Sequence, residues 1–209
     1  MSFIEFVSSY FANKLVKKVP NDKFPTLEDQ IEVYTYWFMF CIGAFIKIIL
    51  LIILSTVIGV LPYTMIIAIT FCSLRSIAGG YHMQTYNKCA VVSITMFIVS
   101  ALLIKYILHY WLFVNILYLL IFCIFASIYI IYRYVPCDNA SGEITKPSEI
   151  KKFKRWSSYY LFIWTIIMTI SLLFNLKIIV ISSCFGLLLE LFSISRIGQV
   201  VYSALDSQK

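Results

Sequence analysis

The sequence predicts an all-α integral membrane protein with about six transmembrane helices and an N-terminal amphipathic helix at the membrane surface. Hydrophobic residues make up 61% of the 209-residue chain and charged residues only 13%, whereas about 25% of the residues of soluble domains are charged. The hydrophobic residues are gathered in long runs, and about 20 apolar residues suffice for one helical crossing. A chain of this length therefore holds about six crossings, and no separate aqueous domain fits.

Residues 1–33 are expected to form a cytoplasmic amphipathic segment. Within residues 2–19 the apolar side chains recur at helical spacing on one face, opposite several lysines, and this pattern is typical of a helix that lies in the membrane interface. A second helix start is predicted at Thr26, because Asp29 follows it at the spacing of a capping pair.

A six-span membrane domain is expected over residues 34–194, followed by a cytoplasmic C-terminal tail over residues 195–209. Turn-forming or polar residues separate its apolar runs. The predicted spans are residues 34–58, 61–78, 89–108, 111–132, 157–174 and 177–194. The two longest polar connections are a segment at 75–89 and a basic loop at 133–156.

The basic residues predict the orientation of the spans. Fourteen of the 17 lie in the two termini or in the connections at 75–89 and 133–156, whereas only Lys105 and Lys177 lie in the opposite connections. The positive-inside rule then places both termini and both polar connections in the cytoplasm. Because the membrane explains the net charge of +7, no nucleic-acid partner is expected.

Several classes of catalytic site are excluded by composition. Residues 33–132 contain no Asp or Glu, and neither an HExxH nor a GxSxG motif occurs. With only two histidines in the chain, a His-rich metal site is not expected, and neither is a mixed site from Cys72, His82 and Cys89. No metal and no cofactor are therefore expected.

The connection at 75–89 carries the most informative residues. Cys89 lies at the mouth of the next span, where the backbone N–H groups of a helix start favour a thiolate, and Lys88 and His82 add positive charge. A nucleophilic cysteine also needs a base within hydrogen-bond reach. Seven residues of straight helix rise about 10.5 Å, so His82 and Cys89 can pair only if the chain bends, which Gly79-Gly80 would permit.

On spacing alone, the simpler interpretation of His82 as a loop residue and of Cys89 as a packing residue is favoured. The segment, however, resembles the signature of the accessory gene regulator B family, bacterial membrane cysteine endopeptidases that process autoinducer precursor peptides. In that family an Arg, a Gly-rich turn, a His and, seven residues later, a Cys recur in this order, as Arg75, Gly79-Gly80, His82 and Cys89 do here. The resemblance implies that His82 and Cys89 are the catalytic pair, supported by Arg75, Gly79, Gly80 and Lys88.

A second segment is similar to another part of that family, a Pro-x-(Asp/Asn) motif followed by a proline and a basic stretch. The matching residues are Pro136, Cys137, Asp138, Asn139, Pro147, Lys151, Lys152, Lys154 and Arg155. Cys137 departs from the alanine common at its position. Pro136, Asp138 and the basic residues are candidate substrate contacts. Two explanations of the basic stretch stay open: it attracts an acidic precursor tail, or it is only a topology signal.

The resemblance implies a function as well as a site. The expected enzyme removes the C-terminal tail of a small precursor peptide and cyclises the product as a thiolactone or lactone for quorum sensing, in the bacterial cell membrane. Its expected partners are that precursor, with an amphipathic leader and an acidic tail, and membrane lipid; a homodimer is left open.

Other residues support rival interpretations. Lys47 and Glu190 are charges within predicted spans, and as a pair they would suit a small non-enzymatic transporter or channel; an interaction scaffold is a third class. Cys137 is a rival nucleophile, although a free surface thiol is the expected interpretation. His109 is expected at the opposite membrane face.

Overall fold

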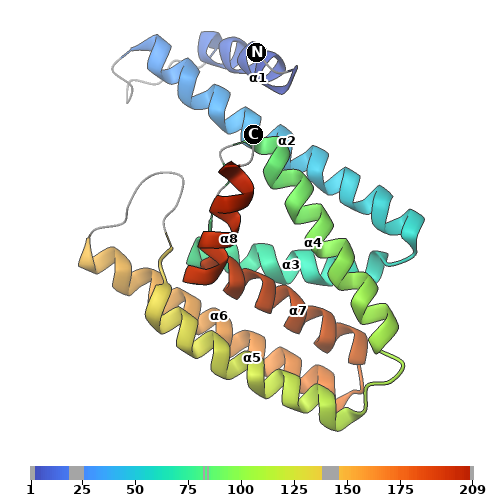
Figure 1. The fold of residues 1–209 in the computed structure, drawn as a ribbon. Coiled ribbons are helices and arrows are strands. Elements are labelled where there is room, and N and C mark those ends of the chain that lie inside the picture. The colour runs from blue at the N-terminus through green and yellow to red at the C-terminus, as the bar shows by residue number, and fades with distance from the viewer. Residues whose placement is uncertain (1–2, 19–25, 82, 84, 138–145, 208–209) are drawn as a thin grey trace. The chain divides into compact units, whose positions relative to one another are not determined.

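The computed structural model describes residues 3–18, 26–81, 83, 85–137 and 146–207. Its elements are α1 (Phe3–Lys18), α2 (Leu27–Ile58), α3 (Leu61–Ala78), α4 (Tyr86–Ile107), α5 (Phe113–Tyr134), α6 (Pro147–Leu173), α7 (Lys177–Ile194) and α8 (Arg196–Ser207) (Figure 1). The described residues contain no strand, and helices α2 to α7 are long and apolar enough to cross a membrane. The predicted fold class, an all-α multi-pass membrane protein, is confirmed.

The chain groups into two compact units, Met1–Leu54 and Ser55–Lys209. In the first unit, the Thr26 hydroxyl accepts a 3.1 Å hydrogen bond from the backbone N–H of Asp29, so the predicted helix start is confirmed. Helix α2 has 32 residues and is about 48 Å long, which exceeds a hydrocarbon core of about 30 Å. Its polar first turns therefore have room outside the bilayer.

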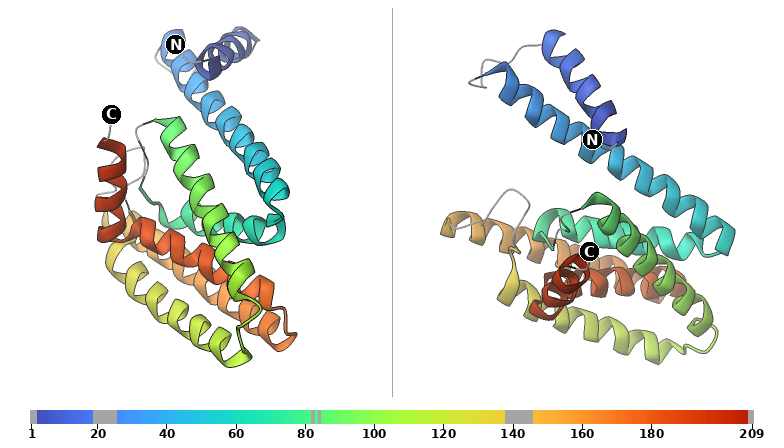
Figure 2. Two further views of the ribbon diagram at one scale, coloured as in Figure 1. Left: turned by 45° about the vertical axis from the view of Figure 1, so that its right-hand side comes forward. Right: turned by 45° about the horizontal axis from the view of Figure 1, so that its top comes forward.

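In the second unit, α5, α6 and α7 run side by side, and α3 packs on α7 (Figure 2). Small residues permit this close approach, as is typical of helix pairs in membranes. A Cβ atom on Gly186 would lie 2.5 Å from the carbonyl oxygen of Ile67. Nearby, the hydroxyls of Thr70 and Ser183 are 3.0 Å apart, and the indole of Trp164 donates a 2.7 Å hydrogen bond to Ser183.

Two boundaries differ from the sequence-based expectation. Helix α6 begins at Pro147 rather than at residue 157, so the second half of the expected basic loop is helical; proline suits the first turn of a helix. Within the expected C-terminal tail, residues Arg196–Ser207 form helix α8, which was not predicted from the sequence. The Ser195 hydroxyl caps it by accepting a 3.1 Å hydrogen bond from the N–H of Gly198, and Gly198, Tyr202 and Asp206 form its buried face.

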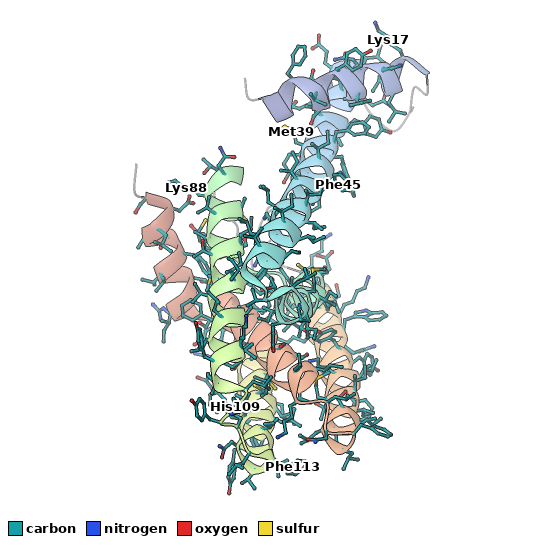
Figure 3. All side chains as sticks on the ribbon, turned by 90° about the vertical axis from the view of Figure 1, so that its right-hand side faces the viewer. Lys17, Met39, Phe45, Lys88, His109 and Phe113 are labelled. Carbon is teal, nitrogen blue, oxygen red and sulfur yellow. The ribbon has the colours of Figure 1, made fainter. Side chains whose placement is uncertain are left out.

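The second unit has two opposite ends, at which its helices begin and finish. Lys88 and His109 mark opposite ends of α4, and Phe113 at the start of α5 lies near His109 (Figure 3). The connection between α3 and α4 is therefore at the Lys88 end. Only Ser195 separates α7 from α8, and α8 also reaches Lys88, so the candidate residues gather at this end.

Candidate functional site

Arg75 in the last turn of α3 joins three parts of the site. Its guanidinium lies 3.4 Å from the carboxylate of Glu190 and donates a 3.0 Å hydrogen bond to the hydroxyl of Ser193, both on α7. The same guanidinium donates to the backbone carbonyl of Tyr81. It also lies over the ring of Phe71, 5.5 Å from its centroid. Arg75 therefore ties the 79–85 connection to α7.

Gly79 and Gly80 make the turn after α3, as the sequence predicted. Gly79 takes φ +78°, a conformation that favours glycine, and its N–H donates to the carbonyl of Arg75. A Cβ atom on Gly80 would lie 2.8 Å from Arg75 Nη1, 2.9 Å from Glu190 Oε1 and 3.0 Å from Ser193 Oγ. A glycine at position 80 thus lets the backbone approach the ion pair.

Helix α8 holds both ends of the segment between Tyr81 and Lys88. The hydroxyl of Tyr81 donates a 3.4 Å hydrogen bond to Asp206 Oδ2. The ammonium of Lys88 lies 3.9 Å from Asp206 Oδ1 and donates to the backbone carbonyl of Asp206. The ring of Tyr81 stacks on that of Tyr202, with centroids 5.8 Å apart and planes at 10°.

Burial raises the pKa of the Tyr81 hydroxyl above its ordinary value, and the neighbouring Asp206 carboxylate raises it further. Burial also raises the pKa of Tyr202; Arg75 opposes this shift, whereas Glu190 and Cys89 add to it. Both phenols are therefore protonated at neutral pH and available as hydrogen-bond donors.

Cys89 lies in the first turn of α4, as predicted, and its backbone N–H already donates to the carbonyl of Thr85, at 3.1 Å. Its side chain is half-buried, and Sγ lies 4.0 Å from the hydroxyl of Ser93. That hydroxyl also donates to the carbonyl of Cys89. A thiol in this place combines access with a fixed backbone, which a nucleophile requires.

Two of the predicted site residues, His82 and Asp138, lie outside the described residues. The pairing of His82 with Cys89 and the role of Asp138 therefore remain predictions.

Cys137, which follows Pro136 in the chain, lies against the turn after α3. The backbone N–H of Cys137 donates a 3.1 Å hydrogen bond to the carbonyl of Ala78, and the side-chain amide of Gln199 on α8 donates a 3.0 Å hydrogen bond to Cys137 Sγ. The Cys137 residue is only 6% exposed. The expectation of a surface thiol at this position was wrong, because α3 and α8 both cover the segment.

The basic candidates for substrate contact lie on the first turns of α6. Lys151, Lys152 and Arg155 are exposed and lie on neighbouring positions of the helix surface. Lys154 instead donates a 2.8 Å hydrogen bond to the carbonyl of Tyr132 at the end of α5, and its ammonium lies 5.3 Å from the centroid of the Tyr132 ring. Three of the four basic side chains thus remain available to an anionic partner.

Several residues of this site were not predicted from the sequence. Ser193, Gln199, Tyr202 and Asp206 gave no motif, although the capping serine at 195 and the i, i+4 spacing of Tyr202 and Asp206 could have indicated a helix. Glu190 was singled out as a charge within a predicted span, and its pairing with Lys47 was left open. In the structure its carboxylate is engaged by Arg75.

This chain is similar in sequence to known proteins. The accessory gene regulator B family model matches residues 8–194. A Clostridium perfringens (strain 13 / Type A) protein named "Putative AgrB-like protein 2" is 25% identical over 214 residues, covering 98% of this chain and 97% of that protein. A "Putative AgrB-like protein" of strain SM101 is 24% identical with the same coverage. No solved structure matches.

Proposed function

Because the chain belongs to the accessory gene regulator B family, we propose that it is a membrane cysteine endopeptidase that processes a small autoinducer precursor peptide. The enzyme removes the C-terminal tail of the precursor and cyclises the remaining part. Its nucleophile is Cys89 and its base is His82.

One observation carries this proposal: the half-buried thiol of Cys89 in the first turn of α4. The segment that leads to it is fixed at both ends, by Arg75 at the carbonyl of Tyr81 and by Asp206 at Lys88. Acyl transfer depends on such fixed geometry, since the thiol must reach a substrate carbonyl at an attack distance of about 3–3.5 Å.

The proposed reaction has two acyl transfers. In the first, His82 takes the proton of Cys89, the sulfur attacks the carbonyl carbon at the boundary of the tail, and the C–N bond breaks. The proton passes from His82 to the leaving amine, which departs with the tail. In the second, a Cys or Ser side chain of the bound peptide attacks the thioester, and a thiolactone or lactone forms while the Cys89 thiol is restored.

Water must be excluded from the thioester, because hydrolysis would give a linear product. Forming a thioester from an amide is also uphill, so release of the tail must pull the reaction forward. A site at the end of a helical bundle, beside the membrane, suits the first requirement. The exposed Lys151, Lys152 and Arg155 suit an acidic tail, and α1 suits an amphipathic leader that shares the membrane surface.

The test uses the purified chain in lipid vesicles with its cognate precursor, an amphipathic peptide with a central Cys or Ser and an acidic tail. We expect Cys89→Ala to abolish cleavage while membrane insertion is retained. Cys72→Ala is the matched control, because it removes an exposed thiol elsewhere. Cleavage by Cys89→Ala at the wild-type rate would overturn the proposal.

The rival function, a small transporter or channel, makes the opposite prediction. It requires Lys47 and Glu190 and leaves Cys89 dispensable. The ion pair between Glu190 and Arg75 favours the enzymatic interpretation, because it links the buried carboxylate to the candidate catalytic segment.

A further inference from the structure

The residues that directly precede His82 and Cys89 in the chain are both held by one carboxylate. Tyr81 precedes His82, and Lys88 precedes Cys89. The Tyr81 hydroxyl and the Lys88 ammonium contact opposite oxygens of Asp206, Oδ2 at 3.4 Å and Oδ1 at 3.9 Å. Asp206 comes more than a hundred residues later in the sequence, so this is a tertiary arrangement and not a local turn.

Contacts with the rest of the unit hold helix α8 in place, and they therefore also hold Asp206. Its Tyr202 stacks on Tyr81 and donates a 3.1 Å hydrogen bond to the sulfur of Met96 on α4. At its N-terminal end, Gln199 donates to Cys137. Asp206 is 7% exposed, and a carboxylate so buried gains more from a cationic partner than an exposed one does.

We propose that Asp206 is a positioning residue for the nucleophile segment: by holding Tyr81 and Lys88 together, it sets the separation of the base and the thiol that follow them. This inference rests on the proposed cysteine endopeptidase function. In this role Asp206 acts through its contacts with Tyr81 and Lys88.

The size of the expected effect follows from the geometry of acyl transfer. A displacement of about 1 Å in a catalytic group can lower a rate about 100-fold. Removing the charge of Asp206 breaks its ion pair with Lys88, while the hydrogen bond from Lys88 to the backbone carbonyl of Asp206 and the helix itself are retained. The turnover number should therefore fall, whereas substrate binding at α6 should be unaffected.

The central experiment compares Asp206→Asn with Ser203→Ala in the full chain in lipid vesicles. Ser203 lies on the exposed side of the same helix and bonds only to the carbonyl of Val200 among the described contacts, so its replacement controls for disturbance of α8. We expect Asp206→Asn to lower kcat by about 10- to 100-fold with KM for the precursor within about twofold, and Ser203→Ala to match the wild type.

A second variant tests the same contact with a smaller change to the structure. Tyr81→Phe removes one oxygen, which breaks the bond to Asp206 and preserves the stacked ring. We expect it to lower kcat in the same direction, and the double variant Tyr81→Phe/Asp206→Asn to be less impaired than the product of the two single effects, because the two residues share one interaction.

A third measurement does not depend on peptidase activity. The alkylation rate of Cys89, followed by peptide mass spectrometry, should change by about threefold or more in Asp206→Asn, since thiol reactivity follows the groups around it. An unchanged alkylation rate together with an unchanged kcat would overturn the positioning role. The endopeptidase proposal fails separately, if Cys89→Ala cleaves like the wild type.

Discussion

The guanidinium of Arg75 and the carboxylate of Glu190 form an ion pair at 3.4 Å near the ends of α3 and α7. The Glu190 side chain is fully buried and that of Arg75 is 20% exposed. Charges within membrane-spanning helices are costly unless they are paired. The pair thus offsets the free-energy cost of burying the Glu190 carboxylate. Arg75 also donates to the carbonyl of Tyr81 and so fixes the connection that leads to Cys89.

Breaking this pair should destabilise the protein. Glu190→Ala leaves the Arg75 charge without its partner, and we expect a loss of about 3 kcal/mol, near the lower end for buried pairs because Arg75 partly reaches solvent. Glu190→Gln keeps a hydrogen-bond acceptor and should cost less. Denaturant unfolding in micelles measures both. Glu149→Gln, in an exposed pair with Lys146, is the control and should change little. Equal stability of Glu190→Ala and wild type would contradict the pairing.

Two glycine substitutions should separate activity from stability. In Gly80→Ala the new methyl group meets Arg75, Glu190 and Ser193 within 3.0 Å, so precursor cleavage should fall by about tenfold or more as the connection shifts. In Gly186→Ala the methyl group meets the backbone of Ile67, and the unfolding free energy should fall by about 1–3 kcal/mol. Wild-type cleavage by Gly80→Ala would show that the close approach is unimportant.

Thiol labelling should distinguish the two candidate nucleophiles. At pH 7 we expect Cys89 to be alkylated faster than Cys137, because Cys137 is buried and accepts a hydrogen bond from Gln199. His82→Ala should slow the labelling of Cys89. Gln199→Ala is the control, and it should speed the labelling of Cys137 by exposing it. If Cys137 reacts first and His82→Ala has no effect, the proposed pairing is wrong.

The acyl-enzyme route predicts different defects for the two members of the pair. Cys89→Ser should lose nearly all turnover and accumulate an ester with the N-terminal part of the substrate, because a hydroxyl is a weaker nucleophile than a thiol and an alkoxide is a poorer leaving group than a thiolate. His82→Ala should keep a trace of cleavage that rises with pH, since hydroxide supplies the thiolate without the base. Intact-mass analysis and a pH–rate profile test these outcomes. Normal turnover by Cys89→Ser would exclude this route.

The orientation of the chain can be tested with reporters. A fusion after Lys209 or an insertion near Gly142 should report a cytoplasmic location, and one near His109 an external location. Lys88 and His109 lie at opposite ends of α4 (Figure 3), which is compatible with this assignment. An external signal at Gly142 would place the basic stretch, and with it the candidate site, on the wrong side for a cytoplasmic precursor.

Most of the fold could be predicted because the relevant information is local. The predicted spans at 61–78 and 177–194 coincide with α3 and α7, since apolar runs of bilayer length bounded by turn residues specify their own ends. Helix α8 has only 12 residues, so it does not carry the signal of an apolar run of bilayer length. Its sequence signals are the capping Ser195 and the spacing of Tyr202 and Asp206, and its stability comes from packing against the rest of the chain.

The part of the site that lies in one short segment was also predictable, because its information is local in the sequence. Arg75, the glycine pair and Cys89 lie in one short segment with a recognisable order. The partners of that segment, Glu190 and Asp206, come more than a hundred residues later. A single sequence shows that these carboxylates exist, but only the tertiary arrangement shows that one meets Arg75 and the other meets Lys88.

The distance along the chain between Lys88 and Asp206 also sets a delay during protein synthesis. The two residues are 118 positions apart, so a ribosome that adds about 5–20 residues per second makes Asp206 about 6–24 s after Lys88. For that interval the thiol of Cys89 is already in the nascent chain, while α7 and α8 do not yet exist. Each newly made molecule therefore passes through a stage in which the proposed nucleophile is present and the candidate site is unassembled, and only completed helices α7 and α8 end that stage.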